Sequence, residues 1–350
     1  MVFRDIGYSI VHETTKRFVR YDNIFLDFWG IWDSVWYLEI AANGYPSLLN
    51  SVAVIRQPPY LNEFFPLYPL LIRAFHWFIG DYFLAGVIIS NICLLVACIY
   101  LYRLVSLQYD KDTAMKSVVY FFLFPSSFIL SAVLSESLAL ALIIMCFYYA
   151  KKEEWAKTGF IGIFLSLTRP IGALIVIPLL YDYLKTRKSR LNFKWAYLLM
   201  FPLGIFLYLS YTYHSLVGFF LYFSGMGSGW GHSLSNPIIS IFSSMSSGSV
   251  FYVFNGLFVT ITLLFLLRFY KKIATSYLLL SLLLILGPLS FSGPNTMLSV
   301  TRYTILAFPI FIQLARIPKR VFIEDMTYIV LFSFQIILMA CWSGGSGLIL

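Results

Sequence analysis

The sequence predicts an all-α protein that crosses a membrane many times. Of the 350 residues, 60% are hydrophobic and only 12% are charged, which excludes a soluble globular protein of this length. Apolar runs recur along residues 82–350. Residues 1–81 instead hold eight of the sixteen acidic residues and no apolar run long enough to span a bilayer. We therefore expect an extramembrane first loop over 1–81 and a transmembrane domain over 82–350.

About ten membrane segments are expected in the second part. They are 82–102, 116–124, 137–150, 158–168, 171–184, 195–213, 250–269, 276–291, 303–315 and 327–342. Several are shorter than the roughly 20 residues of a full span, which is tolerated where their ends are buried in protein or line a cavity. Residues 158–184 could instead form one helix kinked at Pro170.

The basic residues predict which side each loop faces. If the segments alternate, seventeen of the twenty-five Lys and Arg residues fall in loops or at segment ends on one side of the membrane, which by the positive-inside rule is cytoplasmic. This distribution also explains the net charge of +9 without a nucleic-acid partner. The first loop, residues 126–136, the long loop 214–249 and the turn 292–302 are then expected outside.

The first loop contains an acid among aromatic residues, in the stretch from Trp32 to Tyr45. Asp33 and Tyr37 share one face of a predicted short helix, which Gly44 is expected to end. A carboxylate at a membrane cleft can take the proton from an attacking hydroxyl group, so Asp33 is a candidate general base. The alternative is an amphipathic surface helix whose tryptophans lie at the lipid interface.

A second stretch of this loop, residues 64–78, is apolar but too short to span. It begins with prolines and holds Arg73 and His76, so we expect a helix that lies in the membrane interface.

Three charged residues interrupt the apolar segments. A charge there is unfavourable unless it is paired, so Glu136, Arg169 and Arg302 are each candidates for a site. The alternatives are that Ser135 and Glu136 cap a helix N-terminus, that Arg169 forms a structural pair with Glu136, and that Arg302 extends to the interface.

The pattern W-D-[AS]-x-x-[YF]-L-x-I-A-x-x-G-Y at 32–45 resembles the signature of the GPI mannosyltransferase II (PIG-V) family of GT-C class membrane glycosyltransferases. Further family patterns follow in order: F-F-P-x-[YF]-P-L at 64–70, a P…S-E loop at 125–136, T-R-P at 168–170 and T-R-Y at 301–303. The resemblance implies a GT-C-like fold and an inverting transfer of mannose from a polyprenyl (dolichyl) phosphate mannose donor. The acceptor would be a lipid-linked glycan, a glycolipid or another molecule presented at the extracytoplasmic face.

The resemblance also implies site residues. Asp33 would be catalytic, and the substrate-binding residues would be Trp32, Trp36, Tyr37, Glu136, Arg169, Arg302 and Tyr303, with the two arginines meeting the donor phosphate. Glu39 and Glu63 share the first loop and are expected to be solvated.

No cofactor is firmly expected, and the need for a divalent cation stays open. His214 and His232 flank the Gly-rich run 225–231 and could ligate a metal, although two lone histidines on a loop seldom do. That run lacks the strand and helix of a nucleotide-binding loop. The four cysteines show no metal-ligand spacing and are expected to be small packing residues.

In the GT-C class a transmembrane helix precedes the aspartate loop, and no segment before Trp32 could span. We expect an in-frame upstream segment of about 20 apolar residues, or a small membrane subunit that supplies the helix. Compact loops favour a bacterial or archaeal cell membrane over the endoplasmic reticulum membrane, and so disfavour a GPI acceptor.

Two other functions stay open: a GT-C transferase of another sugar, and a polytopic transporter or lipid flippase. Transporters commonly have two related halves, whereas this sequence shows no internal repeat and its acids gather in an outer loop.

Overall fold

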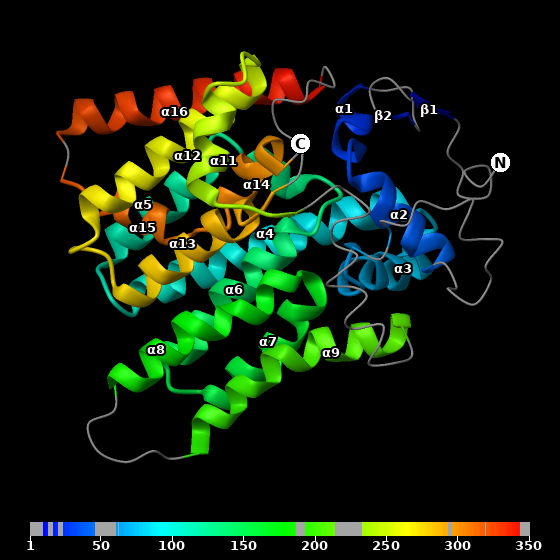
Figure 1. Ribbon diagram of the computed structural model, residues 1–350, viewed down its shortest axis with the longest axis horizontal. Coiled ribbons are helices and arrows are strands. Elements are labelled where there is room, and N and C mark those ends of the chain that lie inside the picture. The colour runs from blue at the N-terminus through cyan, green and yellow to red at the C-terminus, as the bar shows by residue number, and fades with distance from the viewer. Residues whose placement is uncertain are drawn as a thin grey trace.

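The computed structural model describes residues 10–12, 17–19, 24–45, 61, 63–186, 193–213, 233–292, 296–318 and 320–343. In these ranges the chain is predominantly helical (Figure 1). The α-helices are α1 (Ile24–Asp27), α2 (Ser34–Asn43), α3 (Leu67–Ile79), α4 (Tyr82–Ser106), α5 (Lys111–Leu123), α6 (Glu136–Lys151), α7 (Trp155–Thr168), α8 (Val176–Thr186), α9 (Met200–Tyr213), α11 (Pro237–Met245), α12 (Val250–Phe269), α13 (Thr275–Leu289), α14 (Val300–Thr304), α15 (Pro309–Ala315) and α16 (Val321–Ser343). The 3-10 helices are η2 (Phe28–Gly30), η4 (Ser127–Ser131), η5 (Pro170–Ile175), η6 (Phe193–Leu199) and η7 (Thr296–Ser299).

Two short antiparallel strand pairs accompany the helices. The strand β1 (Ile10–His12) pairs with β2 (Arg17–Val19), and β3 (Ser233–Leu234) pairs with β4 (Phe291–Ser292). The second pair joins the segment before α11 to the end of α13.

Four helical stretches in the described ranges are long and apolar enough to cross a membrane. They are α4, the stretch Phe193–Tyr211 that runs from η6 into α9, α12 and α16. The ten predicted runs all lie largely on helical residues, and α12 has the predicted bounds. Other helices on these runs are shorter than the four stretches that could cross a membrane, such as α5 with 13 residues and α7 with 14. The chain is therefore an α-helical membrane protein.

Side-chain caps fix the start of several helices. Asp81 accepts a hydrogen bond from the backbone N–H of Leu84 at 3.0 Å, which starts α4. Asp110 accepts from the N–H of Thr113 at 2.8 Å at the start of α5, and Asn236 caps α11 in the same way. These acceptors satisfy N–H groups that have no partner inside the helix, so each helix begins sharply at a loop.

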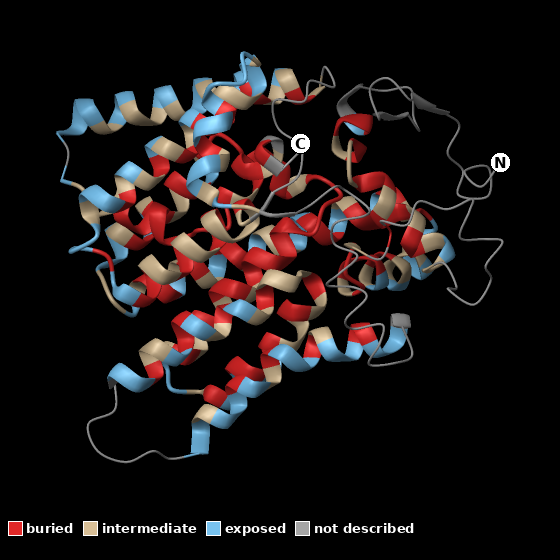
Figure 2. Ribbon diagram, in the orientation of Figure 1, coloured by how far each residue is buried: buried red, intermediate tan, exposed pale blue. Residues whose placement is uncertain are grey.

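The main core lies between α4, α5, α6, α13 and α15, where Figure 2 shows a continuous run of buried residues. Aromatic side chains fill much of it. Phe147 of α6 meets Phe308 edge to face at a centroid distance of 5.6 Å, and Phe121 of α5 meets Phe311 at 5.4 Å. This packing holds the segment that carries Arg302 against α6, whose first residue is Glu136.

A second core attaches the first loop to the membrane helices. Ile31, Leu38, Tyr68, Ile72 and Phe83 are at most 2% exposed and belong to one cluster that joins η2, α2, α3 and α4. The last helix also reaches this cluster, because the indole Nε1 of Trp342 donates to the backbone carbonyl of Phe28 at 3.1 Å. The helix that follows Asp33 is thus anchored to the membrane domain.

The chain breaks between α7 and α8. The helix α7 ends at Thr168, and Arg169 is extended, with φ −153° and ψ 140°. Pro170 causes the break, because a residue that precedes proline disfavours the helical region. Residues 158–184 are therefore two elements and not one kinked helix, and the break presents Arg169 at the end of α7.

The helix α3 lies in the stretch 64–78 where a helix was predicted, and its residues differ in burial. Tyr68 and Ile72 are fully buried, whereas Trp77 and Phe78 near its end are 85% and 88% exposed. Aromatic residues exposed at a helix end suit the membrane interface.

Two predicted loops differ from the structure. Within 214–249, residues 214–232 lie outside the described residues, but 237–245 form the helix α11, which Asn236 and Pro237 start by the usual cap and first-turn proline. The predicted loop 214–249 is therefore partly helical. Within 292–302, Arg302 lies on the short helix α14 and not on a turn.

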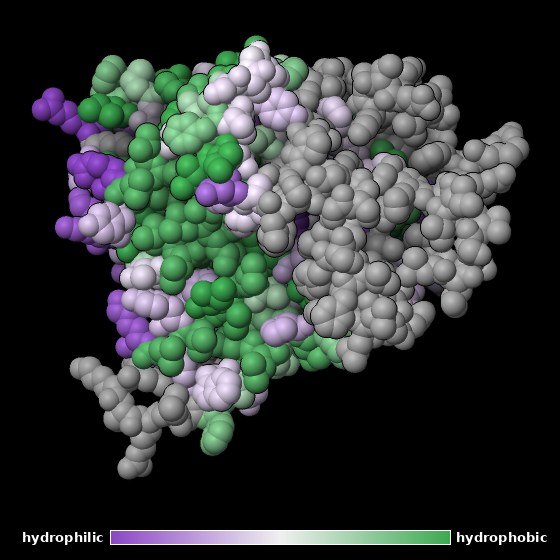
Figure 3. Space-filling view, viewed as in Figure 1, coloured by the Kyte–Doolittle hydropathy of each residue, from purple (hydrophilic) through white to green (hydrophobic). Residues whose placement is uncertain are grey.

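The surface carries the pattern of a membrane domain. Figure 3 shows hydrophobic side chains over the middle of the view and hydrophilic ones at its left edge. Exposed apolar residues are frequent on α12 and α16, such as Ile261 at 65% and Val330 at 64%. Such apolar sides suit contact with lipid.

Candidate active site

Four separate parts of the chain supply one charged cluster. Asp33 precedes α2, Glu136 opens α6, Arg169 follows α7 and Arg302 lies on α14. These are the four charged residues that the sequence selects as site candidates, and the fold brings all of them together. Asp33 and Arg302 are 269 positions apart in the sequence.

Ion pairs connect the four side chains in a chain. Nη2 of Arg302 lies 2.6 Å from Oδ2 of Asp33, and Nε of Arg302 lies 3.0 Å from Oε1 of Glu136. The same Oε1 accepts a hydrogen bond from Nη2 of Arg169 at 2.9 Å. The contact of Nε with Glu136 is an ion pair without a hydrogen bond. We call these residues the charge network.

The network is buried unevenly. The side chain of Glu136 is completely buried and that of Arg302 is 4% exposed, whereas those of Arg169 and Asp33 are 13% and 24% exposed. Ions in such surroundings need partners, because desolvation disfavours each charge alone. The ion pair that we considered for Arg169 is present, and Arg302 does not extend to the interface. Asp33 lies at the accessible side of the network.

Unpartnered polar atoms gather around these ion pairs. Among the described residues, Oε2 of Glu136 and Nη1 of Arg302 are buried without a hydrogen-bond partner. The residues next to Asp33, Glu136 and Arg302 in the sequence carry further unpartnered buried atoms. These are Nε1 of Trp32 and the hydroxyl groups of Ser34, Ser137 and Thr301. Buried polar groups in native proteins are nearly always paired, so this concentration indicates a place where water or a ligand binds.

Tyr303 contacts both arginines. Its ring centroid lies 5.4 Å from Cζ of Arg169 and 5.9 Å from Cζ of Arg302. A tyrosine ring within about 6 Å of a guanidinium attracts it through the ring's negative face. The T-R-Y sequence therefore supplies one cation and a ring that contacts it.

Tyr37 lies behind the charge network. Its hydroxyl group is 2.7 Å from Oγ of Ser135, and its ring contacts Phe64 and Tyr68 edge to face. Burial raises the pKa of Tyr37 to about 12, so the side chain is a neutral phenol at ordinary pH. We expected Ser135 to cap α6 as an alternative, but it makes no capping hydrogen bond, and its hydroxyl joins Tyr37 instead. Tyr37 thus fixes the segment before Glu136.

The two tryptophans of the motif flank Asp33. Both are partly buried against the second core. Trp32 has φ 59°, which is unusual for a bulky residue and is held by the packing around it. This backbone turns the chain immediately before Asp33.

Sequence reasoning missed what Arg73 does. Its Nε donates to the carbonyl of Ala41 at 2.6 Å and its Nη2 to that of Ala42 at 2.8 Å. These are carbonyls of the last turn of α2, which lack partners inside the helix. Arg73 therefore fixes α2 on α3, and the signal was a single arginine within an otherwise apolar run.

The other acids of the first loop are outside the network. Glu39 is only partly exposed and not fully solvated as expected, because its Oε1 accepts from Nδ2 of Asn43 at 2.9 Å on α2 and its Oε2 is buried. Glu63 is partly buried and not solvated as expected, and burial raises its pKa to about 7. Among the described residues, neither forms an ion pair with Arg169 or Arg302, whose partners are Asp33 and Glu136.

No group of three or more His, Cys, Asp and Glu side chains within metal-binding reach occurs in the described ranges. His214, His232 and the run 225–231 lie outside the described residues. The four cysteines are free thiols, and Cys98 and Cys146 are buried.

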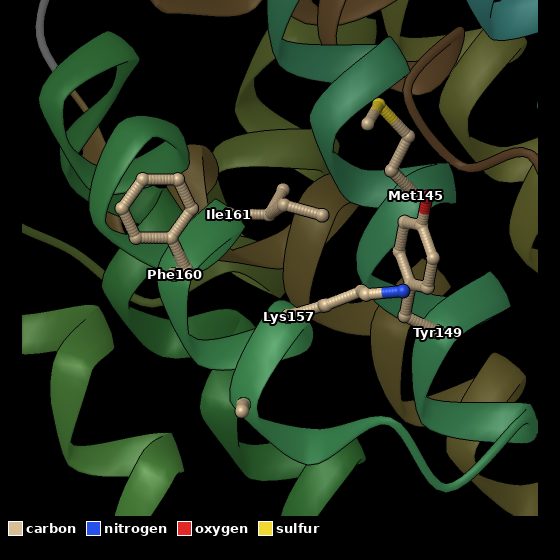
Figure 4. A pocket seen from close by; sticks show the side chains of 6 residues that line it. Met145, Tyr149, Lys157, Phe160 and Ile161 are labelled. Carbon is tan, nitrogen blue, oxygen red and sulfur yellow. The ribbon is translucent and has the colours of Figure 1, made fainter.

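A shallow apolar groove lies elsewhere, between the end of α6 and the start of α7 (Figure 4). Met145, Tyr149, Phe160 and Ile161 line its volume of about 400 Å³, and the ammonium group of Lys157 lies 5.3 Å from the Tyr149 ring centroid. Tyr149 is thirteen residues beyond Glu136 on α6, or about 20 Å along the helix. The groove is thus separate from the charge network.

The charge network combines a carboxylate that can accept a proton with two guanidinium groups that can hold an anion. No protein-family model, curated protein or solved structure matches this chain. Its function is therefore inferred from its own residues.

Proposed function

We propose that this chain is a membrane glycosyltransferase that moves mannose from a polyprenyl phosphate mannose donor to a hydroxyl group of an acceptor at the outer face of the membrane. One observation carries the proposal: the aspartate of the first-loop motif is ion-paired with an arginine of the membrane domain, beside a second arginine. The order of the motifs along the sequence, which resembles the GPI mannosyltransferase II family, supplies the donor class.

Asp33 would act as the general base. The oxygen of the acceptor hydroxyl group forms a bond to the anomeric carbon of the sugar, and its proton passes to the carboxylate of Asp33. The bond between that carbon and the donor phosphate oxygen breaks on the opposite face, and the phosphate keeps both electrons. The configuration at the anomeric carbon inverts, and the products are the glycosylated acceptor and polyprenyl phosphate.

Arg302 and Arg169 would meet the phosphate charge. Negative charge grows on the leaving phosphate as its bond to the sugar breaks, and fixed guanidinium groups in a site with little water stabilise that charge. Tyr303 would keep both guanidinium groups in place. Trp32 and Trp36 would exclude water and stack on sugar rings.

The distribution of charged residues among the loops supports placing the site at the outer face of the membrane. The expected outer segments contain the network residues, and the Lys and Arg residues of the other loops indicate a cytoplasmic face. We propose a GT-C-like arrangement of about ten spans in a bacterial or archaeal cell membrane, with membrane lipids around it.

The test is transfer by the purified, reconstituted protein. Labelled polyprenyl phosphate mannose and membrane lipids should give a labelled product, and Asp33→Asn should lose about 10²–10⁴-fold in turnover. Glu39→Gln is the matched control, because it removes a carboxylate of α2, the helix that follows Asp33, outside the network and should keep activity. Full activity of Asp33→Asn would overturn the assignment of the base. A divalent cation requirement is read from the same assay with chelator.

A lipid transporter is the second candidate, because buried ion pairs between membrane helices also occur at coupling sites of transporters. Protein-dependent movement of a labelled lipid across the same vesicles, without any glycosylated product, would favour it.

A further inference from the structure

The charge network is already neutral before any donor binds. It contains two carboxylates and two guanidinium groups, in contact with one another. A phosphodiester that entered it would add one negative charge to a buried site, where an unpaired charge is strongly disfavoured. One of the two carboxylates must therefore leave its arginine when a phosphate binds.

Asp33 is the carboxylate that can leave. Glu136 is completely buried, and its Oε1 is within 3.0 Å of nitrogens from both arginines. Asp33 is 24% exposed and contacts Arg302 with one oxygen. Its backbone carbonyl accepts from the N–H groups of Trp36 and Tyr37, so the side chain can rotate while the start of α2 stays in place.

Arg302 has the capacity to receive the phosphate. Its Nη1 is buried without a partner, and Nη2 is the atom that Asp33 would release. Two further unpartnered donors, Nε1 of Trp32 and the hydroxyl of Thr301, belong to residues next to Asp33 and Arg302 in the sequence and would be available to phosphate oxygens. A guanidinium that binds carboxylate also suits phosphate, because its forked N–H groups match both anions.

We infer that the donor binds by anion exchange: its phosphate takes the place of Asp33 on Arg302, and this frees the carboxylate to accept the proton of the acceptor. The inference rests on the proposed function and adds an order of events to it: the donor binds first, and the base is released second. Without donor, the carboxylate is held by Arg302 and its Oδ2 is occupied. With donor, the phosphate occupies Arg302 and the carboxylate of Asp33 is released beside the sugar that the donor carries.

Binding to variants tests the exchange. The probe is farnesyl phosphate, a short lipid phosphate without sugar, titrated by calorimetry into the detergent-solubilised full chain. Asp33→Asn removes the competing anion and should lower Kd about tenfold or more, because hydrogen bonds to charged groups contribute to this extent. Glu39→Gln removes a carboxylate of α2, the helix that follows Asp33, outside the network and should leave Kd unchanged. Inorganic phosphate, in a parallel titration, shows whether the phosphate group alone is recognised or the lipid chain is also needed.

The exchange also requires that the tighter binding of farnesyl phosphate by Asp33→Asn depend on Arg302. In an Arg302→Gln background, where no cation is left for the two anions to compete for, Asp33→Asn should no longer tighten binding. Equal or weaker binding by Asp33→Asn in the native background would overturn the exchange, and so would a gain that persists without Arg302, since that would be a general charge effect.

The two proposals fail separately. Transfer activity without the binding gain leaves the glycosyltransferase and removes the exchange. The binding gain without transfer of any sugar leaves the exchange and removes the glycosyltransferase.

Discussion

Oε1 of Glu136 lies 2.9 Å from Nη2 of Arg169, and the Glu136 side chain is completely buried. The pair joins the first turn of α6 to the break after α7. Because the same oxygen also faces Arg302, Glu136 neutralises two cations that the fold places beside the first loop.

Glu136→Gln should therefore destabilise the protein strongly. The variant leaves two buried guanidinium groups with only Asp33 as a counter-ion, and removing one partner of a buried pair costs about 3–5 kcal/mol. Glu154→Gln is the control, because Glu154 pairs with Lys152 and Lys157 at an exposed surface where ion pairs contribute little. Thermal unfolding in detergent should show a clear loss only for Glu136→Gln, and equal Tm values would contradict the role of the network.

Gly44→Ala tests how α2 ends. Gly44 has φ 79° and ψ −169°, a region that is essentially restricted to glycine, so alanine should cost about 1–3 kcal/mol. Gly80 ends α3 in the left-handed helical region, at φ 77° and ψ 4°, where asparagine is also tolerated. We expect Gly80→Asn to be nearly neutral and Gly44→Asn to be destabilising. Similar unfolding temperatures for the two asparagine variants would show that α2 ends differently.

The pair α7 and α9 depends on close backbone approach. A Cβ atom at Gly204 of α9 would collide with the backbone carbonyl of Ile163, whereas one at Gly287 of α13 would meet only a side-chain methyl of Ile171 at 3.1 Å. Overpacking of this kind costs typically 1–3 kcal/mol, so Gly204→Ala should lower Tm. Gly287→Ala should keep or raise Tm, because alanine is more favourable than glycine inside a helix, and an unchanged Tm for Gly204→Ala would contradict the close approach.

Much of the fold follows from local sequence. The bounds of α12 agree with the prediction because an apolar run without breaks lies between a Ser and Gly loop and a basic cluster. Pro170 determined where α7 ends. The four charged candidates were also identified, because a charge in an apolar segment needs a partner.

Their partners could not be predicted. The contact between Asp33 and Arg302 joins residues 269 positions apart, and nothing local encodes it. The hydrogen bonds of Arg73 to α2 likewise depend on how α3 packs. The helix α11 was missed because serine-rich composition outweighed its Asn-Pro start.

Glu63 should make stability depend on pH. Burial raises its pKa from 4.5 to about 7, so between these pH values the folded protein holds a proton that the unfolded chain has released. This contribution to stability is largest below pH 4.5 and is lost as the pH rises to 7. Glu63→Gln stays neutral, so its Tm relative to the native protein should rise between pH 5 and pH 8.

Asp110→Asn is the control for that measurement. Hydrogen bonds from Thr113 lower the pKa of Asp110 below 3.8, so its contribution does not change between pH 5 and pH 8. A Tm difference between Glu63→Gln and the native protein that is the same at both pH values would contradict the raised pKa of Glu63.

Arg302 should affect transfer more than any other basic residue of the described chain. It contacts both carboxylates of the network, whereas Arg169 contacts only Glu136. By analogy with the loss of one donor from an oxyanion hole, Arg302→Gln should lower kcat for polyprenyl phosphate mannose about 10²–10³-fold. Arg302→Lys keeps the charge without the forked donors, so its kcat should lie between those of the native protein and Arg302→Gln.

Arg103→Gln is the control, because Arg103 lies exposed in the last turn of α4, in a predicted cytoplasmic loop. If Arg302→Gln and Arg103→Gln turn over the donor equally, while both remain folded by size-exclusion chromatography, Arg302 does not meet the donor phosphate.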